Sequence, residues 1–594
     1  MVATNEGKNT NSRSQKRSRG RSGDTAAANG IGTAVAAATP AQRRSPAERR
    51  VPPAPEVGGR KAARRIRGLA ALSDTLDIRN RLRRLGALVQ GGGRDAQRMT
   101  FVEAAIGECL DEAAAVASVR DRWLSCEAAT WAVGWMARTR RAGGSAGSLL
   151  ERLVRLAHSA TTSLAAGDTL PACFVLTLSR LFRDIEACRC LEESATAAVG
   201  TEIDRLVSAD GVVNLSDSAA MVDRVVRWTQ FREVASVTGD PCWSDATAGR
   251  WQAAALGALR LLGDEARAFA GAGRVPACFT KPLVEAVEGM GGRCRRTARV
   301  VAGGTESCRR REVLPRDLHD PAAAVAIVRS GWARDSLRVM LDYRAAVPRL
   351  EIAVGERMLV SGPWEWDVTC DGVHLEAESA WRVNGWETGR KGTFLEITAS
   401  LGGGLQIERQ LVVLPEERIV LLADAVIPTT AAAEAGELNH RAVLPLAASL
   451  DAEAGPENRE IVVYDTAMRF MALPLALPEW RSAGRGAFEV AGQSLVLTQE
   501  GRGGLYAPVW LDCDASHVGG PLTWRQLTVA DTRRNIEPRQ AAGFRVQAGL
   551  RQWLLYRSLE TPRNRTLLGC NVSSGFLLGR IKRCGEVART LEID

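Results

Sequence analysis

Apolar side chains recur along this chain with two different periods. From about residue 68 to about residue 300 they return every three to four positions. Residues 99–119 read MTFVEAAIGECLDEAAAVASV. Their apolar side chains have the spacing i, i+3, i+4, i+7, i+8, at positions Val102, Ala105, Ile106, Cys109 and Leu110. This spacing lines one face of a helix, so the segment predicts an amphipathic α-helix.

The helical rhythm repeats at intervals of roughly 25 to 35 residues, separated by short polar links. The further segments that carry it are residues 125–140, 146–167, 171–193, 216–239 and 240–263. No sequence motif repeats with them, so the repetition is one of architecture. Antiparallel helix pairs arranged as an incomplete (α/α) toroid fit this pattern, and so does an ordinary helical bundle.

The period changes to two after a segment rich in Gly, Arg and Cys, residues 288–324. Short alternating runs, broken by turn signals such as Gly-Glu, Gly-Gly-Gly and Pro-Glu-Glu, occupy residues 335–343, 349–362, 392–401, 404–415, 417–427, 460–466, 488–500, 526–538, 542–560 and 574–583. Alternating strands without intervening helices have one apolar face that a second sheet must cover. These runs therefore predict an antiparallel β-sandwich, and the Gly-Gly-Gly of residues 402–404 a hairpin turn.

Together the two periods predict a multidomain α+β protein. At 594 residues the chain exceeds what one hydrophobic core organises. We expect a basic disordered tail over residues 1–65, a toroid-like all-α domain over residues 66–310, and a large antiparallel β-sandwich domain over residues 320–594.

The net charge of +10 is concentrated at the start of the chain. Residues 1–60 hold eleven Lys or Arg against four Asp or Glu, a net charge of +7, which leaves about +3 for the remaining 534 residues. A solvated leader is the favoured interpretation of such a tail, so nucleic acid is expected as a partner only weakly and through the tail. Arginine outnumbers lysine about twelve to one, which is typical of a GC-rich bacterial genome.

Other composition features exclude several classes of protein. Thirteen scattered cysteines predict reduced thiols rather than a disulfide framework. The usual nucleotide, hydrolase and zinc-protease motifs are absent, so we expect no cofactor and no metal. The first thirty residues hold no apolar leader core and no run of eighteen apolar residues occurs. The expected location is cytoplasmic by default, without a membrane span, and export is left open.

The chain resembles the heparinase II/III-like family of polysaccharide lyases. The resemblance is carried by residues 322–343, by RLEIAVGERMLVSGPWEW at 349–366, by the region of Asp424, and by the closing segment at residues 556–580. It covers about residues 70 to 594 and rests on domain order and loose pattern. It implies β-elimination at a uronic acid, in which a base takes the C5 proton, a Tyr or His protonates the leaving oxygen, and a polar group neutralises the carboxylate.

This sequence departs from the family pattern at two points. The family's catalytic tyrosine sits on the toroid, whereas the four tyrosines here all follow the helical half, at positions 343, 464, 506 and 556. The family's His-x-His segment is also missing, because RAAVPRLEIAV follows Tyr343. The resemblance therefore fits an active lyase or a degenerate member that binds polysaccharide or protein without cleaving.

Among the five histidines, His440 is the first candidate for catalysis. Asn439, His440 and Arg441 cluster where a strand begins, and an imidazole beside an amide and a guanidinium can move a proton near an anionic sugar. A structural role is the favoured alternative. His319 lies in the link between the two halves, where a turn role is favoured.

The segment SGPWEWDVTCDGVHLEAESAWRVNGWE, residues 361–387, contains four tryptophans. Trp364 and Trp366 are two positions apart and would face the same side of one strand, so they are candidates for stacking on a sugar ring. Core or interface packing is the favoured alternative. The partner expected from these residues and from the resemblance is an anionic polysaccharide.

Overall fold

The computed structural model describes residues 58–594 except 92–95, 116–117, 139–144, 216–217, 237–241, 263–267, 271–272, 276, 304–312, 334, 432, 482–483 and 518–521. Nearly all of the segment expected to be a basic tail lies outside the described residues.

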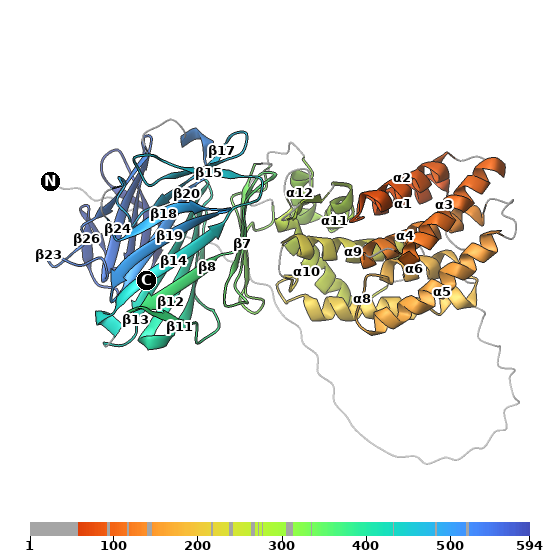
Figure 1. The fold of residues 1–594 in the computed structure, drawn as a ribbon, viewed down its shortest axis with the longest axis horizontal. Helices are drawn as coiled ribbons and strands as arrows, with labels where there is room; N and C mark the ends of the chain where they lie inside the picture. Colours follow the sequence, from red (N-terminus) through yellow and green to blue (C-terminus); the bar gives the residue numbers. More distant parts are fainter. Residues whose placement is uncertain are drawn as a thin grey trace, which may run out of the picture. The chain divides into compact units, whose positions relative to one another are not determined.

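Helices make up the first half of the described chain (Figure 1). Their bounds are α1 Gly59–Ala70, α2 Leu76–Gln90, α3 Ala96–Ala115, α4 Val119–Met136, α5 Ser145–Ala165, α6 Ala172–Leu181, α7 Glu186–Arg189, α8 Glu192–Leu206, α9 Ser218–Ser236, α10 Asp245–Leu261, α11 Ala277–Gly289 and α12 Gly292–Val301. A short hairpin, β1 Ala268–Ala270 and β2 Gly273–Val275, lies between α10 and α11.

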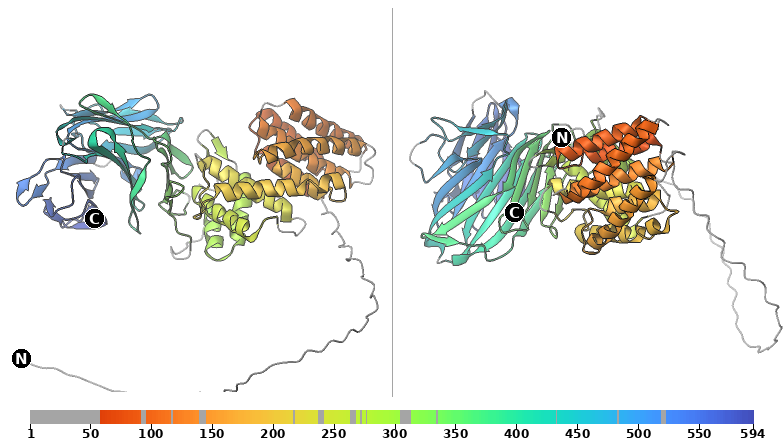
Figure 2. Two further views of the ribbon diagram at one scale, coloured as in Figure 1. Left: turned by 90° about the horizontal axis from the view of Figure 1, so that it is seen from below. Right: turned by 45° about the vertical axis from the view of Figure 1, so that its right-hand side comes forward.

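The helices pack in an inner and an outer set. Helix α4 is buried along almost its whole length, with Trp131 and Met136 nearly inaccessible, because it contacts α1, α2, α3, α5 and α6. Helices α1 and α5 instead show one buried stripe and one exposed face. A helix that is apolar all round must be enclosed, while an amphipathic one covers it. Figure 2 shows this layered, toroid-like arrangement of antiparallel helices.

The second half forms four larger sheets. The junction sheet contains β3 Leu318–Asp320, β4 Val325–Arg329, β5 Leu337–Asp342, β6 Arg349–Val354 and β7 Arg357–Pro363. The outer sheet, in the order β18-β19-β14-β8-β9, contains β8 Glu365–Cys370, β9 Val373–Leu375, β14 Glu437–Pro445, β18 Gly486–Ala491 and β19 Ser494–Arg502. The middle sheet, in the order β10-β11-β12-β13-β20-β17-β16-β15, contains β10 Arg382–Thr388, β11 Thr393–Leu401, β12 Leu405–Leu414, β13 Ile419–Pro428, β15 Asp451–Ala454, β16 Ile461–Tyr464, β17 Met468–Pro474 and β20 Leu505–Asp512. The C-terminal sheet, in the order β21-β24-β25-β28-β29, contains β21 Leu522–Leu527, β24 Ala541–Ala548, β25 Arg551–Ser558, β28 Phe576–Ile581 and β29 Val587–Ile593.

A small sheet completes the fold with β22 Ala530–Asp531, β23 Arg534–Asn535, β26 Arg565–Leu567 and β27 Cys570–Val572. All the pairings between these strands are antiparallel.

The central strands of the middle sheet are buried on both faces. In β12 every residue from Ile407 to Leu414 is buried. Ile407 and Leu411 belong to the core shared with the junction and outer sheets, whereas Val412 and Leu414 belong to the core shared with the C-terminal sheet. Successive side chains of a strand point to opposite faces, so this one strand supplies two cores.

The predicted hairpin turn between residues 401 and 405 is confirmed. Strands β11 and β12 pair from Leu401↔Leu405 to Thr393↔Val413, and Gly402–Gly404 form the turn. Gly404 has φ of 75°, and a Cβ placed there would lie 2.4 Å from Oγ1 of Thr430. Glycine is therefore required here both by its conformation and by the space available.

Buried arginines join the helices to the junction sheet. Arg329 of β4 donates to the carbonyl oxygens of Arg260 and Leu262, at 2.6 and 2.8 Å, and Arg338 of β5 donates to that of Leu261 at 2.9 Å. The last carbonyls of a helix have no partner within it, so these guanidiniums satisfy the end of α10. The junction sheet and its link between β4 and β5 also contribute apolar side chains to the core of the helical region, namely Val325, Ile327, Trp332 and Met340.

The predicted fold class is confirmed, because an all-α toroid-like region is followed by a large antiparallel β-sandwich. The first helix begins at Gly59, inside the segment expected to be tail. The end of the tail at residue 65, the end of the helical domain at residue 310 and the start of the β-sandwich domain at residue 320 stay predictions.

The arginine junction can be tested by Arg329→Met. We expect the free energy of unfolding to fall by about 2–4 kcal/mol, because buried carbonyls at the end of α10 lose their donors. Chemical denaturation followed by circular dichroism would measure this. Arg382→Met, which changes an exposed side chain, should alter stability by less than about 0.5 kcal/mol. An equal effect of both changes would contradict the capping role.

Candidate functional site

The first candidate residue, His440, lies in a buried ionic cluster between the outer and middle sheets. Its Nε2 is 2.9 Å from Oδ2 of Asp424. Arg409 donates to both oxygens of the same carboxylate, at 2.8 and 3.1 Å, and its guanidinium lies over the ring of Trp364 at 3.6 Å from the centroid. His440, Asp424 and Arg409 are each about 1% exposed.

The charges of this cluster compensate one another. Burial alone would raise the pKa of Asp424, but Arg409 and His440 outweigh it and hold that pKa below its ordinary value. Asp424 is therefore an ionised carboxylate inside the protein. A bidentate guanidinium is the geometry that stabilises such a charge, which gives the cluster a structural role.

Asn439 and Arg441 do not join His440. The three residues follow one another on β14, where burial alternates, so His440 points into the core while Asn439 and Arg441 are exposed on the opposite face. The structure thus separates the three predicted catalytic residues. Nδ1 of His440 makes no hydrogen bond to any residue that the structure describes. The catalytic assignment of these residues stays a prediction.

The two tryptophans suggested for stacking on a sugar have different surroundings. Trp364 is 3% exposed and is covered by Arg409, and the cavity beside it measures only about 20 Å³. Trp366 is half-buried, its ring meets that of Trp381 edge-on at 6.1 Å, and both indoles donate to the carbonyl of Ala346. Trp366 is thus the more accessible of the two, and the role in substrate binding stays a prediction.

A second candidate site lies where the junction sheet meets the helical region. Nε2 of His319, on β3, is 2.9 Å from the hydroxyl of Tyr343, just after β5. The half-buried imidazole also packs on Trp386 of β10, with ring centroids 4.6 Å apart. Next to Tyr343, Arg344 donates to Asn214 and to the carbonyl of Leu215 in the helical region. We call His319 and Tyr343 the His–Tyr pair.

The surroundings of the His–Tyr pair set its protonation. Burial lowers the pKa of His319, against the opposing effect of Asp320 and of Asp210 from the helical region. Burial, together with Asp320 and Asp342, raises the pKa of the Tyr343 phenol. At neutral pH the imidazole is therefore neutral and can accept a proton, while the phenol retains its proton and can donate it.

The His–Tyr pair could not be predicted from the sequence pattern. His319 and Tyr343 are far apart in the chain and neither belongs to a recognisable motif. The strand register brings them together, because His319 pairs with Ala326 and Ala326 with Leu341, two residues before Tyr343 on the same face. Knowledge of the order β3-β4-β5 would have revealed the pair.

A third polar cluster occupies the other face of the middle sheet. Arg557 of β25 lies 2.9 Å from Glu396 of β11 and also pairs with Glu408 of β12. Gln410 donates to Glu396 and accepts from Tyr506. Burial and the charge of Glu396 raise the pKa of Glu408 to about 7, against Arg557. Glu396, Glu408 and Arg557 line a cavity of about 600 Å³.

Neither of the two large cavities contains the predicted site residues. The larger, about 700 Å³, is lined by residues of the outer, middle and C-terminal sheets, among them Gln499, Tyr506 and Phe544, and by loop residues such as Arg485 and Arg539. Within the described part of the chain, no group of three or more His, Cys, Asp or Glu side chains is arranged to hold a metal ion. No helix among the described residues is long and apolar enough to cross a membrane.

No protein-family model and no curated protein matches this sequence. Solved structures do match. A heparinase III described as the BT4657 gene product superposes with a TM-score of 0.52 and 10% identity, over 80% of this chain and 83% of that one. The same protein with methylated lysines gives 0.51 and 10%, over 74% and 73%. A mutant of the heparan sulfate lyase HepC from Pedobacter heparinus gives 0.49 and 12%, over 84% and 83%.

The fold is therefore that of the polysaccharide lyases built from a helical region and a β-sandwich. Within that class it is heparinase III-like, so the expected resemblance is confirmed for the fold.

The buried ionic cluster can be tested by Arg409→Met. We expect a loss of about 3–5 kcal/mol in the free energy of unfolding, because Asp424 would keep its charge without its main partner. Denaturation curves would also compare the double variant Arg409→Met/Asp424→Asn, which removes both charges and should be more stable than the single variant. A double variant less stable than the single one would contradict charge compensation.

The raised pKa of Glu408 predicts a pH dependence of stability. The folded protein holds this proton up to about pH 7, whereas the ordinary pKa is 4.5. The stabilising contribution is therefore complete below pH 4.5 and is lost as pH rises through about 7. Relative to Glu408→Gln, the wild-type protein should lose on the order of 3 kcal/mol across this window.

Unfolding free energies measured from pH 4.5 to 7.5 would test this prediction. Glu489→Gln, at an exposed position of β18, serves as the control and should follow the wild-type slope. A wild-type slope that persists in Glu408→Gln would mean that another group is responsible.

Proposed function

We propose that the protein acts on an anionic, uronic-acid-containing polysaccharide and cleaves it by β-elimination at the boundary between the helical region and the junction sheet. The observation that carries this proposal is the hydrogen bond between His319 and Tyr343, within a heparinase III-like fold. The similar structures with a TM-score above 0.5 are of a heparinase III, which supports a glycosaminoglycan as the substrate class.

The chemistry needs three groups, and the boundary offers each. A neutral His319 is suited to take the proton from C5 of the uronic acid, and the protonated Tyr343 to give one to the leaving oxygen. Asn214 and Arg344 contact each other there and can hold the substrate carboxylate, which would share the Arg344 guanidinium with Asp342. Exposed Asn439 and Arg441 are further candidates for contacting the glycan.

Binding without cleavage is the second candidate function. Tyr343 is only 2% exposed and His440 only 1%, so neither presents its reactive atom at the surface. A protein that retains the fold but encloses these groups would bind polysaccharide as a scaffold.

An assay with a panel of uronic-acid polysaccharides, followed by the ultraviolet absorbance of the unsaturated product, separates the two functions. If elimination occurs, Tyr343→Phe and His319→Ala should each lower kcat about 10²- to 10⁴-fold, because each removes one proton-transfer group. His158→Ala, at an exposed position of α5, is the matched histidine control and should retain activity.

His440→Ala distinguishes catalysis from folding. If His440 only supports the ionic cluster, the variant should lose stability while the fraction that stays folded keeps its kcat. A folded His440→Ala variant without activity would instead make His440 catalytic. Glycan binding without product on any polysaccharide of the panel would favour the scaffold function.

A further inference from the structure

Positive charge is concentrated in one helical hairpin of the described chain. Residues 59–90, which form α1, α2 and their short link, hold nine Lys or Arg against two Asp or Glu, a net charge of +7. Residues 91–594 together carry a net charge of −3. The hairpin is therefore far more basic than the remainder of the folded chain.

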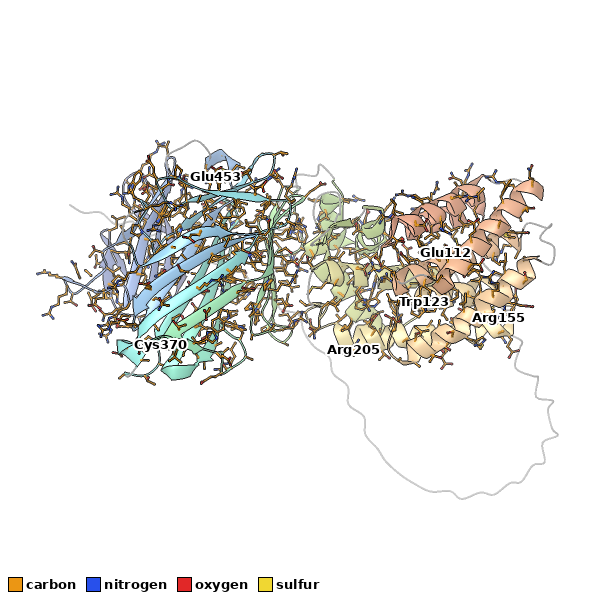
Figure 3. All side chains as sticks on the ribbon, viewed as in Figure 1. Glu112, Trp123, Arg155, Arg205, Cys370 and Glu453 are labelled. Atoms are coloured by element: carbon orange, nitrogen blue, oxygen red, sulfur yellow. The ribbon has the colours of Figure 1, made fainter. Side chains whose placement is uncertain are left out.

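Some of these basic residues are neutralised by neighbouring helices. Arg65 pairs with Glu233 of α9 at 2.6 Å and lies over the ring of Trp131. Arg81 pairs with Glu112 of α3 at 3.0 Å, and Figure 3 labels this glutamate. The half-buried Arg65 and Arg81 thus have acidic partners on other helices.

Five outward-facing basic residues have no acidic partner, whereas exposed Arg84 lies 3.8 Å from Glu108. Arg60, Lys61, Arg64 and Arg83 are exposed and make no hydrogen bond or ion pair to any residue that the structure describes. Arg67, also exposed, donates only to the neutral Gln90. We call these five side chains the basic ridge. The opposite face of α1 is buried, so the ridge is the solvent face of an amphipathic helix and its neighbour.

The basic ridge runs along α1. Arg60, Arg64 and Arg67 follow one another at helical spacing and span about 10 Å of the helix axis. Like charges at positions i and i+4 destabilise a helix, by about 0.2–0.5 kcal/mol per pair. The unpaired cations are here gathered in a row on the most basic segment of the described chain, and such a row points to an anionic partner outside the chain.

We propose that the basic ridge binds an anionic polysaccharide chain as a second contact, separate from the His–Tyr pair. This inference rests on the proposed function for the class of partner. Single-stranded nucleic acid is the less favoured partner, because residues 59–90 contain no Phe, Tyr or Trp on which bases could stack, and duplex binding is an outcome of the test. A row of cations without aromatic neighbours suits a flexible polymer of carboxylates and sulfates.

The test compares two triple variants of the full-length chain that change charge equally. The ridge variant is Arg60→Gln/Lys61→Gln/Arg64→Gln. The control variant is Arg525→Gln/Arg534→Gln/Arg583→Gln, at three exposed positions of the β region. Fluorescence anisotropy would measure binding of labelled heparin and of a DNA duplex over a range of salt concentrations, and circular dichroism would confirm that the helices remain folded.

We expect the ridge variant to raise the Kd for heparin about tenfold at 0.1 M salt, and to flatten the dependence of log K on log salt by about two to three. The control variant should change neither. If the wild-type protein cleaves a short oligosaccharide, the ridge variant should cleave it at the same rate.

Each other outcome overturns the inference in a distinguishable way. If wild-type protein binds no polysaccharide, the proposed function fails together with the ridge. If heparin binding is measurable but both triple variants weaken it equally, or neither does, the ridge fails alone. If the ridge variant loses affinity for DNA but keeps that for heparin, the partner is nucleic acid and the polysaccharide assignment is wrong.

Discussion

The centre of the middle sheet buries both of its faces, and this constraint organises the β region. The central strands are β11, β12, β13 and β20, and they are buried on both sides, as Val412 and Val413 on β12 illustrate. Two further layers then have to cover the sheet, which the outer and junction sheets do on one face and the C-terminal sheet on the other. The connections between layers follow from that requirement.

Charged residues inside such a sheet require partners within reach. Arg409 points to one face and meets Asp424, while Glu408, its neighbour in the chain, points to the other and meets Arg557. Each cluster keeps its ions close enough to offset the loss of water.

Much of the fold could be read from the sequence, because periodicity reports burial directly. The alternation around Ile407 and the helical spacing around Ile106 each predict the observed element. The exact start of α1 could not be read, because Arg60, Arg64 and Arg67 resemble a continuation of the basic tail, while the buried stripe of Ala62, Ala63 and Ile66 is weakly apolar.

The candidate site was harder to predict. Asn439, His440 and Arg441 are adjacent in sequence, but adjacency on a strand places neighbours on opposite faces. His319 and Tyr343 are distant in sequence, and only the antiparallel register of three strands brings them within 2.9 Å. Proximity in a sheet is a property of strand order, which periodicity does not encode.

Strand β12 contributes alternate side chains to two cores, and this limits where the chain can gain or lose residues. Adding one residue between Ile407 and Glu408 would shift the rest of β12 by one position, turning Arg409 toward the C-terminal sheet and Arg557, and Glu408 toward Asp424, so that both clusters would place like charges together. Related proteins should therefore accommodate insertions at the Gly402–Gly404 turn or between other strands, and keep the length of this strand fixed.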